Sequence, residues 1–142
     1  MRTQILKGAS LALVLGVLAL SAPAPVAAAD IRANVPFSFT VSKKVLPPGT
    51  YNVSNNGAGT LVITGFGAGA IVMGQRTESA TSTSPKLVFH RYGDEYILRE
   101  VWMGNGSGHK LAETRREHEL ASGRSGAATA SASFETVEVA IQ

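Results

Sequence analysis

Arginine and aromatic residues are concentrated between positions 91 and 102 of this 142-residue chain. Guanidinium groups and aromatic rings can stack on a sugar or a peptide, so this composition could form a binding surface. The candidate ligand-binding residues are Arg91, Tyr92, Tyr96, Arg99 and Trp102. The competing interpretation is that the tyrosines and the tryptophan fill the core while the arginines lie at its rim. We favour core packing, because aromatic side chains usually dominate protein cores.

The three histidines, His90, His109 and His118, are the candidate metal ligands in a chain that contains no cysteine. They lack the short spacings of common zinc sites, although ligands distant in sequence could still meet in the fold. His118 lies between Glu117 and Glu119, and adjacent residues of a helix point to different faces. We therefore expect neither a metal site nor another cofactor.

No arrangement of catalytic residues is evident, so we expect that the protein is not an enzyme. The chain has no Gly-x-Ser-x-Gly motif, and its serines lie mainly in small-residue loops. Residues 65–70 resemble a dinucleotide-binding loop, but strand-like residues follow where a helix should begin. Asp94 and Glu95 suit a turn. The other carboxylates suit a solvated helix face, and they are Glu113, Glu117 and Glu119. A hydrolase with scattered catalytic residues ranks last among the functions considered.

The first 29 residues are typical of a cleavable signal peptide. Arg2 and Lys7 provide a positive start, residues 9–20 are uncharged and mostly apolar, and residues 27–29 are alanines that suit a cleavage site. An N-terminal membrane anchor is the alternative, but the apolar run is shorter than the roughly 20 residues that span a bilayer. We expect a periplasmic or extracellular protein, without a transmembrane segment after cleavage.

Loss of this segment would lower the formal net charge from +3 to +1, because Arg2 and Lys7 are its only charged residues. So small a charge gives no electrostatic reason to expect nucleic-acid binding. The absence of cysteine excludes disulfides and thiol nucleophiles. Export without disulfides fits a bacterial envelope protein better than a small secreted eukaryotic domain.

Residues 30–142 are expected to form a single β-rich domain. Alternating or short apolar segments that indicate strands recur along it (31–41, 51–53, 61–64, 70–73 and 134–141). Pro36 interrupts the first segment, so this strand is expected to lie at a sheet edge or to contain a bulge. The predicted fold class is a mainly β domain, a small antiparallel β-sandwich or open β-barrel with one surface α-helix near the C-terminus.

An antiparallel hairpin is the clearest predicted element. Residues 86–92 and 95–103 alternate in the manner of strands and flank Gly93-Asp94, which suits a tight turn. Residues 104–108 are predicted to be a flexible, glycine-rich break.

The helix is predicted over residues 110–121, where Arg115 and Glu119 form an i,i+4 pair. The following segment, 122–133, consists mainly of small residues and is predicted to be a linker to the last strand, 134–141.

Three sequence blocks have a recognisable order. They are Val-Pro-Phe-Ser-Phe at 35–39, Leu-Pro-Pro-Gly-Thr-Tyr at 46–51 and Lys-Leu-Val-Phe-His-Arg-Tyr-Gly at 86–93, with Trp102 and a charged helix after them. In this order the chain resembles small exported proteins of unknown function from soil bacteria of the acidobacterial group. The resemblance covers most of residues 31–121. It implies an exported bacterial domain, and that family has no established activity or site residues.

Two functions remain open at this point. The favoured one is a non-enzymatic, envelope-associated structural or interaction module that binds an envelope protein or a glycan, for which an exposed strand edge would serve. The alternative is a small β-barrel that binds a lipid or a sugar. Its pocket would be lined by aromatic residues (Phe37, Tyr51, Phe89, Tyr96 and Trp102).

Overall fold

The structure is a computed structural model that describes residues 30–81, 84–123 and 134–141. The described residues form ten strands and one helix. In chain order the elements are β1 (Asp30–Val35), β2 (Phe39–Val41), β3 (Lys44–Leu46), β4 (Gly49–Asn55), β5 (Thr60–Gly65), β6 (Ala68–Glu78), β7 (Lys86–Tyr92), β8 (Glu95–Gly104), β9 (Ser107–Leu111), α1 (Arg115–Gly123) and β10 (Glu135–Ala140). The predicted signal peptide and most of the predicted linker lie outside these residues.

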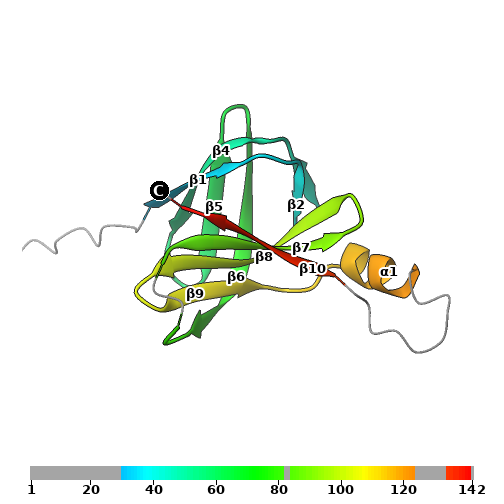
Figure 1. Cartoon of the computed structure of the whole chain (residues 1–142). Coiled ribbons are helices and arrows are strands. Elements are labelled where there is room, and N and C mark those ends of the chain that lie inside the picture. Colours follow the sequence, from blue (N-terminus) through cyan, green and yellow to red (C-terminus); the bar gives the residue numbers. More distant parts are fainter. Residues whose placement is uncertain (1–29, 82–83, 124–133, 142) are drawn as a thin grey trace, which may run out of the picture.

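The strands form one curled sheet in the order β1-β4-β5-β6-β9-β8-β2-β3, and β7 pairs with both β8 and β10. The fold is therefore mainly β with one helix near the C-terminus, as predicted (Figure 1). Every described strand pair is antiparallel except β2 with β8, which is parallel. The sheet does not close into a barrel, because β1 and β10 lie near each other without pairing.

The long strand β6 connects the two sides of the curled sheet. Its first six residues, 68–73, pair with β5, and its last five, 74–78, pair with β9 on the opposite edge. The change of partner falls at Gly74, where an added Cβ atom would come within 2.9 Å of the His109 Cβ. Glycine is required there because the two strands approach so closely.

Pro36 ends the first strand at the sheet edge, in agreement with the prediction. Strand β1 pairs with β4 alone, and the chain after Pro36 crosses to β8, where Thr40 of β2 lies beside Ile97. The 31–41 segment is therefore two strands with different neighbours.

The predicted hairpin is confirmed as β7 and β8, joined at Gly93 and Asp94. The pairing shifts by one residue between Val88 and Phe89, which is a β-bulge. A bulge changes the side on which the following residues of one strand face. Leu98 and Val101 consequently both face the core although they are three residues apart.

The predicted helix bounds are wrong at the N-terminal end. Lys110 and Leu111 belong to β9, which pairs with both β6 and β8, and the helix begins at Arg115. Residues 104–108 are not a flexible break but the turn of the β8–β9 hairpin, with positive φ at Asn105 and Gly106. Backbone pairing on both edges of β9 outweighs the weak helical pattern of this short segment. At the other end, the helix includes Ser122 and Gly123 of the predicted linker.

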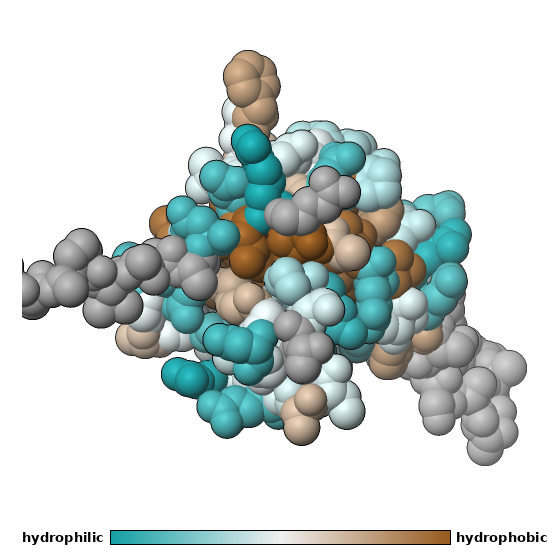
Figure 2. Space-filling model, turned by 60° about the vertical axis from the view of Figure 1, so that its left-hand side comes forward, coloured by the Kyte–Doolittle hydropathy of each residue, from teal (hydrophilic) through white to brown (hydrophobic). Residues whose placement is uncertain are grey.

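The core lies inside the curled sheet and consists of alternate residues from most strands. Its largest fully buried side chains include Phe39, Leu46, Leu61, Ile63 and Phe89. Figure 2 shows hydrophobic residues near the centre of one side, between hydrophilic residues. The helix covers part of the outer surface and contributes one buried side chain, that of Glu117. Among the described residues, no helix is long and apolar enough to cross a membrane.

Candidate functional site

The structure does not bring the five predicted binding residues together on one surface. Arg91 and Tyr96 lie opposite each other in the β7–β8 hairpin, with the Arg91 guanidinium carbon 5.5 Å from the centre of the Tyr96 ring. Arg91 also donates a hydrogen bond to the Gly93 carbonyl at 2.8 Å and pairs with Glu135 at 3.2 Å. Tyr96 stacks on Phe37 at 3.9 Å between ring centres. Both residues are thus engaged by the protein itself.

Tyr92 and Arg99 meet instead at the buried carboxylate of Glu117, beneath helix α1. Arg99 Nη1 lies 3.1 Å from Glu117 Oε2, and the Tyr92 hydroxyl lies 3.5 Å from Glu117 Oε1. Burial, followed by the charge of Glu117, raises the pKa of Tyr92 above its ordinary value. His90 completes the cluster, with Nδ1 3.7 Å from Glu117 Oε1. This is the densest group of titratable side chains in the described structure.

A reciprocal helix cap explains why Glu117 points inward. The Thr114 hydroxyl accepts a hydrogen bond from the Glu117 backbone N–H at 3.2 Å, and the Glu117 carboxylate accepts one from the Thr114 N–H at 3.2 Å. This is a capping box, whose Thr-x-x-Glu spacing is visible in the sequence. The sequence analysis placed Glu117 on a solvated helix face, which is wrong, because its side chain is 3% exposed. The capping spacing was the signal that could have identified it.

Trp102 lies apart from both groups. Its indole N–H donates to Glu100 Oε2 at 2.8 Å, and its ring covers Gly108 of the neighbouring strand, where an added Cβ atom would come within 2.5 Å of the ring. Trp102 is 6% exposed. These contacts fit a packed tryptophan.

The aromatic residues proposed for a ligand pocket are also divided. Four of them join the core through ring contacts, in which Phe37 meets Phe89 and Tyr96, and Phe39 links Phe89 with Tyr51. Trp102 lies outside this group. It is not part of the core cluster, to which its chain neighbour Val101 belongs. The structure therefore offers no single cavity lined by all five.

The histidines lie in separate places. His90 packs under Phe134 with the ring centres 3.8 Å apart, while the His109 Nε2 lies 3.4 Å from Asn55 Nδ2. His118 pairs with Glu113 at 3.4 Å, and Glu113 does not lie on the helix face where it was expected. Glu113 precedes the helix, so helical spacing does not apply. No group of three or more metal-binding side chains occurs among the described residues.

Free strand edges are the remaining structural feature with a recognised role in binding. Unpaired backbone N–H and C=O groups of an edge strand can pair with another chain, and charged residues, prolines or short length normally protect such edges. Free edges of the described sheet include those on β1, β3, β10 and the first half of β6. These edges differ in how well they are protected against pairing with another chain.

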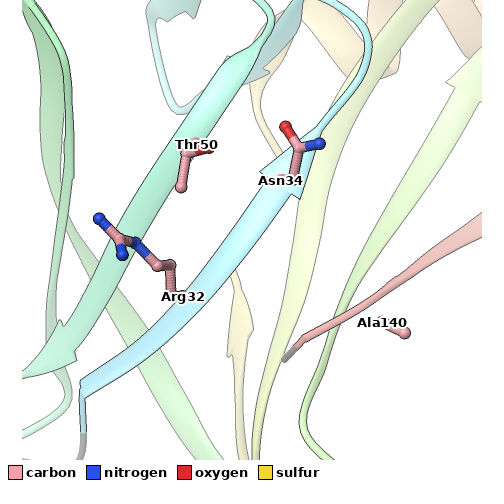
Figure 3. A pocket seen from close by; sticks show the side chains of 4 residues that line it. All are labelled: Arg32, Asn34, Thr50 and Ala140. Carbon is pink, nitrogen blue, oxygen red and sulfur yellow. The ribbon is translucent and has the colours of Figure 1, made fainter.

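Strand β1 is a protected edge. Its exposed side chains are Asp30, Arg32 and Asn34, and Pro36 follows the strand. Figure 3 shows Arg32 and Asn34 on β1 beside Thr50 of β4, with Ala140 of β10 across an open hollow. The hollow measures about 640 Å³. Charged and polar side chains at its rim disfavour the addition of a further strand.

Two other edges are protected in different ways. Strand β10 carries Glu135 and Glu138, whose ion pairs with Arg91 and Lys86 hold it on β7. Strand β3 has only three residues, which is too short to template an extended partner.

The first half of β6 is not protected by charge, by proline or by short length, although β3 approaches this strand without pairing with it. Ile71 and Met73 are 73% and 74% exposed, and residues 68–73 contain no charged side chain. The Gly74 N–H donates to the Gly59 carbonyl at 2.8 Å, so residues 70 and 72 also direct their backbone groups to β5. The backbone groups of Gly69, Ile71 and Met73 therefore point to the unpaired edge.

A groove of about 650 Å³ runs along this unprotected edge. One wall is the β5–β6 hairpin, including Val62 and Ile71, and the other is the β2–β3 turn, including Ser42, Lys43 and Lys44. Apolar side chains and free backbone groups on one wall face polar and cationic groups on the other. This arrangement suits the binding of an extended polypeptide.

Comparisons of the chain with protein-family models, curated proteins and solved structures found no match. The functional proposal therefore rests on the geometry of the groove and of the β6 edge.

Proposed function

We propose that this chain is an exported, non-enzymatic interaction module of a bacterial envelope, which binds an extended segment of a partner protein on the free edge of β6. The observation that carries the proposal is the unprotected stretch of residues 68–73, which has two exposed apolar side chains and no charge. Edge strands that avoid partners normally carry the opposite features.

The partner segment would add as a new strand beside β6. Its backbone would pair with the N–H and C=O groups of Gly69, Ile71 and Met73, which gives affinity with little dependence on sequence. Alternate side chains of the added strand would lie against Ile71 in the groove, and those between them would point to the opposite face of the sheet. Specificity would come from these side chains, with apolar residues favoured at the centre of the groove.

The sharpest test replaces Ile71 with proline. Because the Ile71 N–H points to the free edge, Ile71→Pro removes a donor to the partner strand without removing a bond to β5, and edge positions tolerate proline. Ile71→Val is the matched control, since it retains both the N–H and an apolar side chain. Purified residues 30–142 would be immobilised, mixed with envelope extract and washed, and bound proteins would be identified by mass spectrometry.

We expect a specific protein to be retained by the wild type and by Ile71→Val, and to be lost with Ile71→Pro. Hydrogen exchange provides the second readout, in which the amides of Gly69, Ile71 and Met73 become protected only in the complex. Equal retention by Ile71→Pro and Ile71→Val would exclude binding by strand addition at this edge. Retention of no protein under any condition would count against the interaction module itself.

A further inference from the structure

Acidic residues are sparse in the first half of the described chain. No Asp or Glu occurs between Asp30 and Glu78, and the cations there are Arg32, Lys43, Lys44 and Arg76. Residues 31–77 thus carry a formal charge of +4, whereas residues 78–142 carry −2. Residues 31–77 are therefore the positive part of a chain whose net charge is small.

Within this positive half, residues 45–75 contain no charged side chain at all. The segment includes the β5–β6 hairpin, which projects from the body of the molecule (Figures 1 and 2). Phe66 is fully exposed at the tip of this hairpin, and the positive φ of 75° at Gly67 forms the turn that presents it. Ile71 and Met73 extend the exposed apolar surface along the outer side of the hairpin.

Two lysines lie beside the hairpin without acidic partners. Lys43 and Lys44 are exposed and line the same groove as Val62 and Ile71. Neither lysine takes part in an ion pair among the described residues, whereas Lys86 and Lys110 are both paired with glutamates. The apolar hairpin is thus accompanied by two lysines that form no ion pair among the described residues.

We propose that the β5–β6 hairpin docks the protein on an anionic phospholipid surface. Phe66 enters the boundary between headgroups and acyl chains, Ile71 and Met73 follow along the hairpin, and Lys43 and Lys44 approach the phosphates. Apolar burial and attraction to anionic lipids act together in interfacial binding of this kind. This inference goes beyond the proposed function, because the lipid contacts side chains of the tip and outer face and not the backbone groups of the β6 edge.

The shape of the surface favours a lipid over other anionic partners. A fully exposed aromatic side chain at a projecting tip can enter a soft, planar surface, whereas a protein partner would need a matching pocket. An anionic glycan would attract the lysines but offers no acyl chains in which Phe66 could be buried.

Vesicle binding tests the proposal with residues 30–142, which contain every buried residue of the described core. Circular dichroism first establishes that each variant has retained its β-sheet content. Sedimentation with vesicles of phosphatidylcholine alone is compared with vesicles in which one third of the lipid is phosphatidylglycerol. We expect binding only to the anionic vesicles, and weakening of that binding as salt is raised.

Four variants separate the apolar and electrostatic contributions. Phe66→Ser is expected to weaken binding about tenfold, from the loss of one buried aromatic side chain. Each of Lys43→Gln and Lys44→Gln is expected to weaken it about fivefold. Phe66→Trp is expected to bind as tightly as the wild type and to show a blue shift of fluorescence on binding, whereas the buried Trp102 of the wild type does not respond.

The double variant Lys86→Gln and Lys110→Gln is the matched charge control, because it removes two positive charges from the other half of the chain. It is expected to bind anionic vesicles as the wild type does. Phe66→Ser should still capture the partner protein of the strand-addition proposal, because Phe66 supplies no backbone group to the β6 edge, and this outcome separates the two proposals. Absence of binding to anionic vesicles, or equal binding by Phe66→Ser, would overturn the proposal. Capture of an envelope protein through Phe66 without vesicle binding would replace the lipid with a protein partner.

Discussion

Arg99 Nη1 lies 3.1 Å from the buried carboxylate of Glu117, and this pair fastens helix α1 to the outer face of the sheet. The helix has no buried apolar side chain, so the usual hydrophobic attachment of a surface helix is missing. Its contacts with the sheet include this charged pair, which is removed from water, and an exposed ion pair of Arg116 with Glu95, while the capping box made with Thr114 fixes its first turn.

Glu117→Gln is expected to destabilise the protein by about 3 kcal/mol, because it leaves a largely buried guanidinium without its closest partner. Glutamine preserves the capping box, so the loss reports the charge interaction. Urea unfolding followed by circular dichroism measures the effect. Glu119→Gln is the control, because Glu119 forms an exposed i,i+4 pair with Arg115, and its loss should cost no more than about 0.5 kcal/mol. Equal effects of the two changes would show that the buried pair does not hold the helix.

Thr114→Ala tests the capping box at the start of the helix. Loss of the hydroxyl that accepts the Glu117 N–H should cost about 1 kcal/mol. The effect should be local, so hydrogen exchange of α1 amides should accelerate more than exchange of the β7–β8 hairpin. Thr114→Ser keeps the hydroxyl and should behave as the wild type. Uniform acceleration across the sheet would contradict a capping role.

Gly108→Ala should destabilise the sheet by about 1–3 kcal/mol, because the new methyl group would overlap the ring of Trp102. The added Cβ atom would lie 2.5 Å from the ring, and backbone strain is not involved, since φ at Gly108 is not in the left-handed region. Gly123→Ala is the control, with nothing within 4 Å of its added Cβ atom. Replacing Trp102 with leucine in the Gly108→Ala background should recover part of the loss, which urea unfolding of the wild type and the three variants would reveal.

Local patterns in the sequence predicted the strands whose two faces differ. The hairpin over residues 86–103 followed from alternation around Gly93 and Asp94, and Pro36 identified an edge strand by the donor it lacks. The start of the helix was misplaced because Lys110 and Leu111 gain more from pairing with β6 and β8 than their helical pattern indicates. A local sequence pattern does not show which strands, distant in sequence, will pair.

The candidate binding residues show the same limit. Arg91, Tyr92, Tyr96 and Arg99 lie close in sequence, but side chains of one strand alternate between faces, and the bulge after Val88 changes that alternation. Tyr96 consequently stacks on Phe37, whereas Arg99 joins Glu117 on the other side. The free edge of β6 could not be predicted, because it depends on which strands fail to pair.

Stability is expected to fall as the solution is acidified below about pH 6.5, because two imidazoles are buried. Burial, and secondarily the charge of Arg99, lowers the pKa of His90 below its ordinary value of 6.5. Burial, with Arg76 nearby, lowers the pKa of His109 in the same way. The unfolded chain therefore binds more protons than the folded chain between 6.5 and the lowered pKa values, and the free energy of unfolding decreases with falling pH across that window.

Urea unfolding at intervals from about pH 8 to about pH 5.5, above the range where carboxylates titrate, measures this slope. The double variant His90→Gln and His109→Gln should have a flatter profile than the wild type, whatever its stability at neutral pH. His118→Gln is the control, because His118 has a side chain that is 67% exposed and its replacement leaves both buried imidazoles in place. If the double variant kept the full wild-type slope, proton uptake by the buried histidines could not be the cause of acid destabilisation. If the slope is flatter in the double variant and unchanged in His118→Gln, the acid sensitivity of the protein comes from His90 and His109.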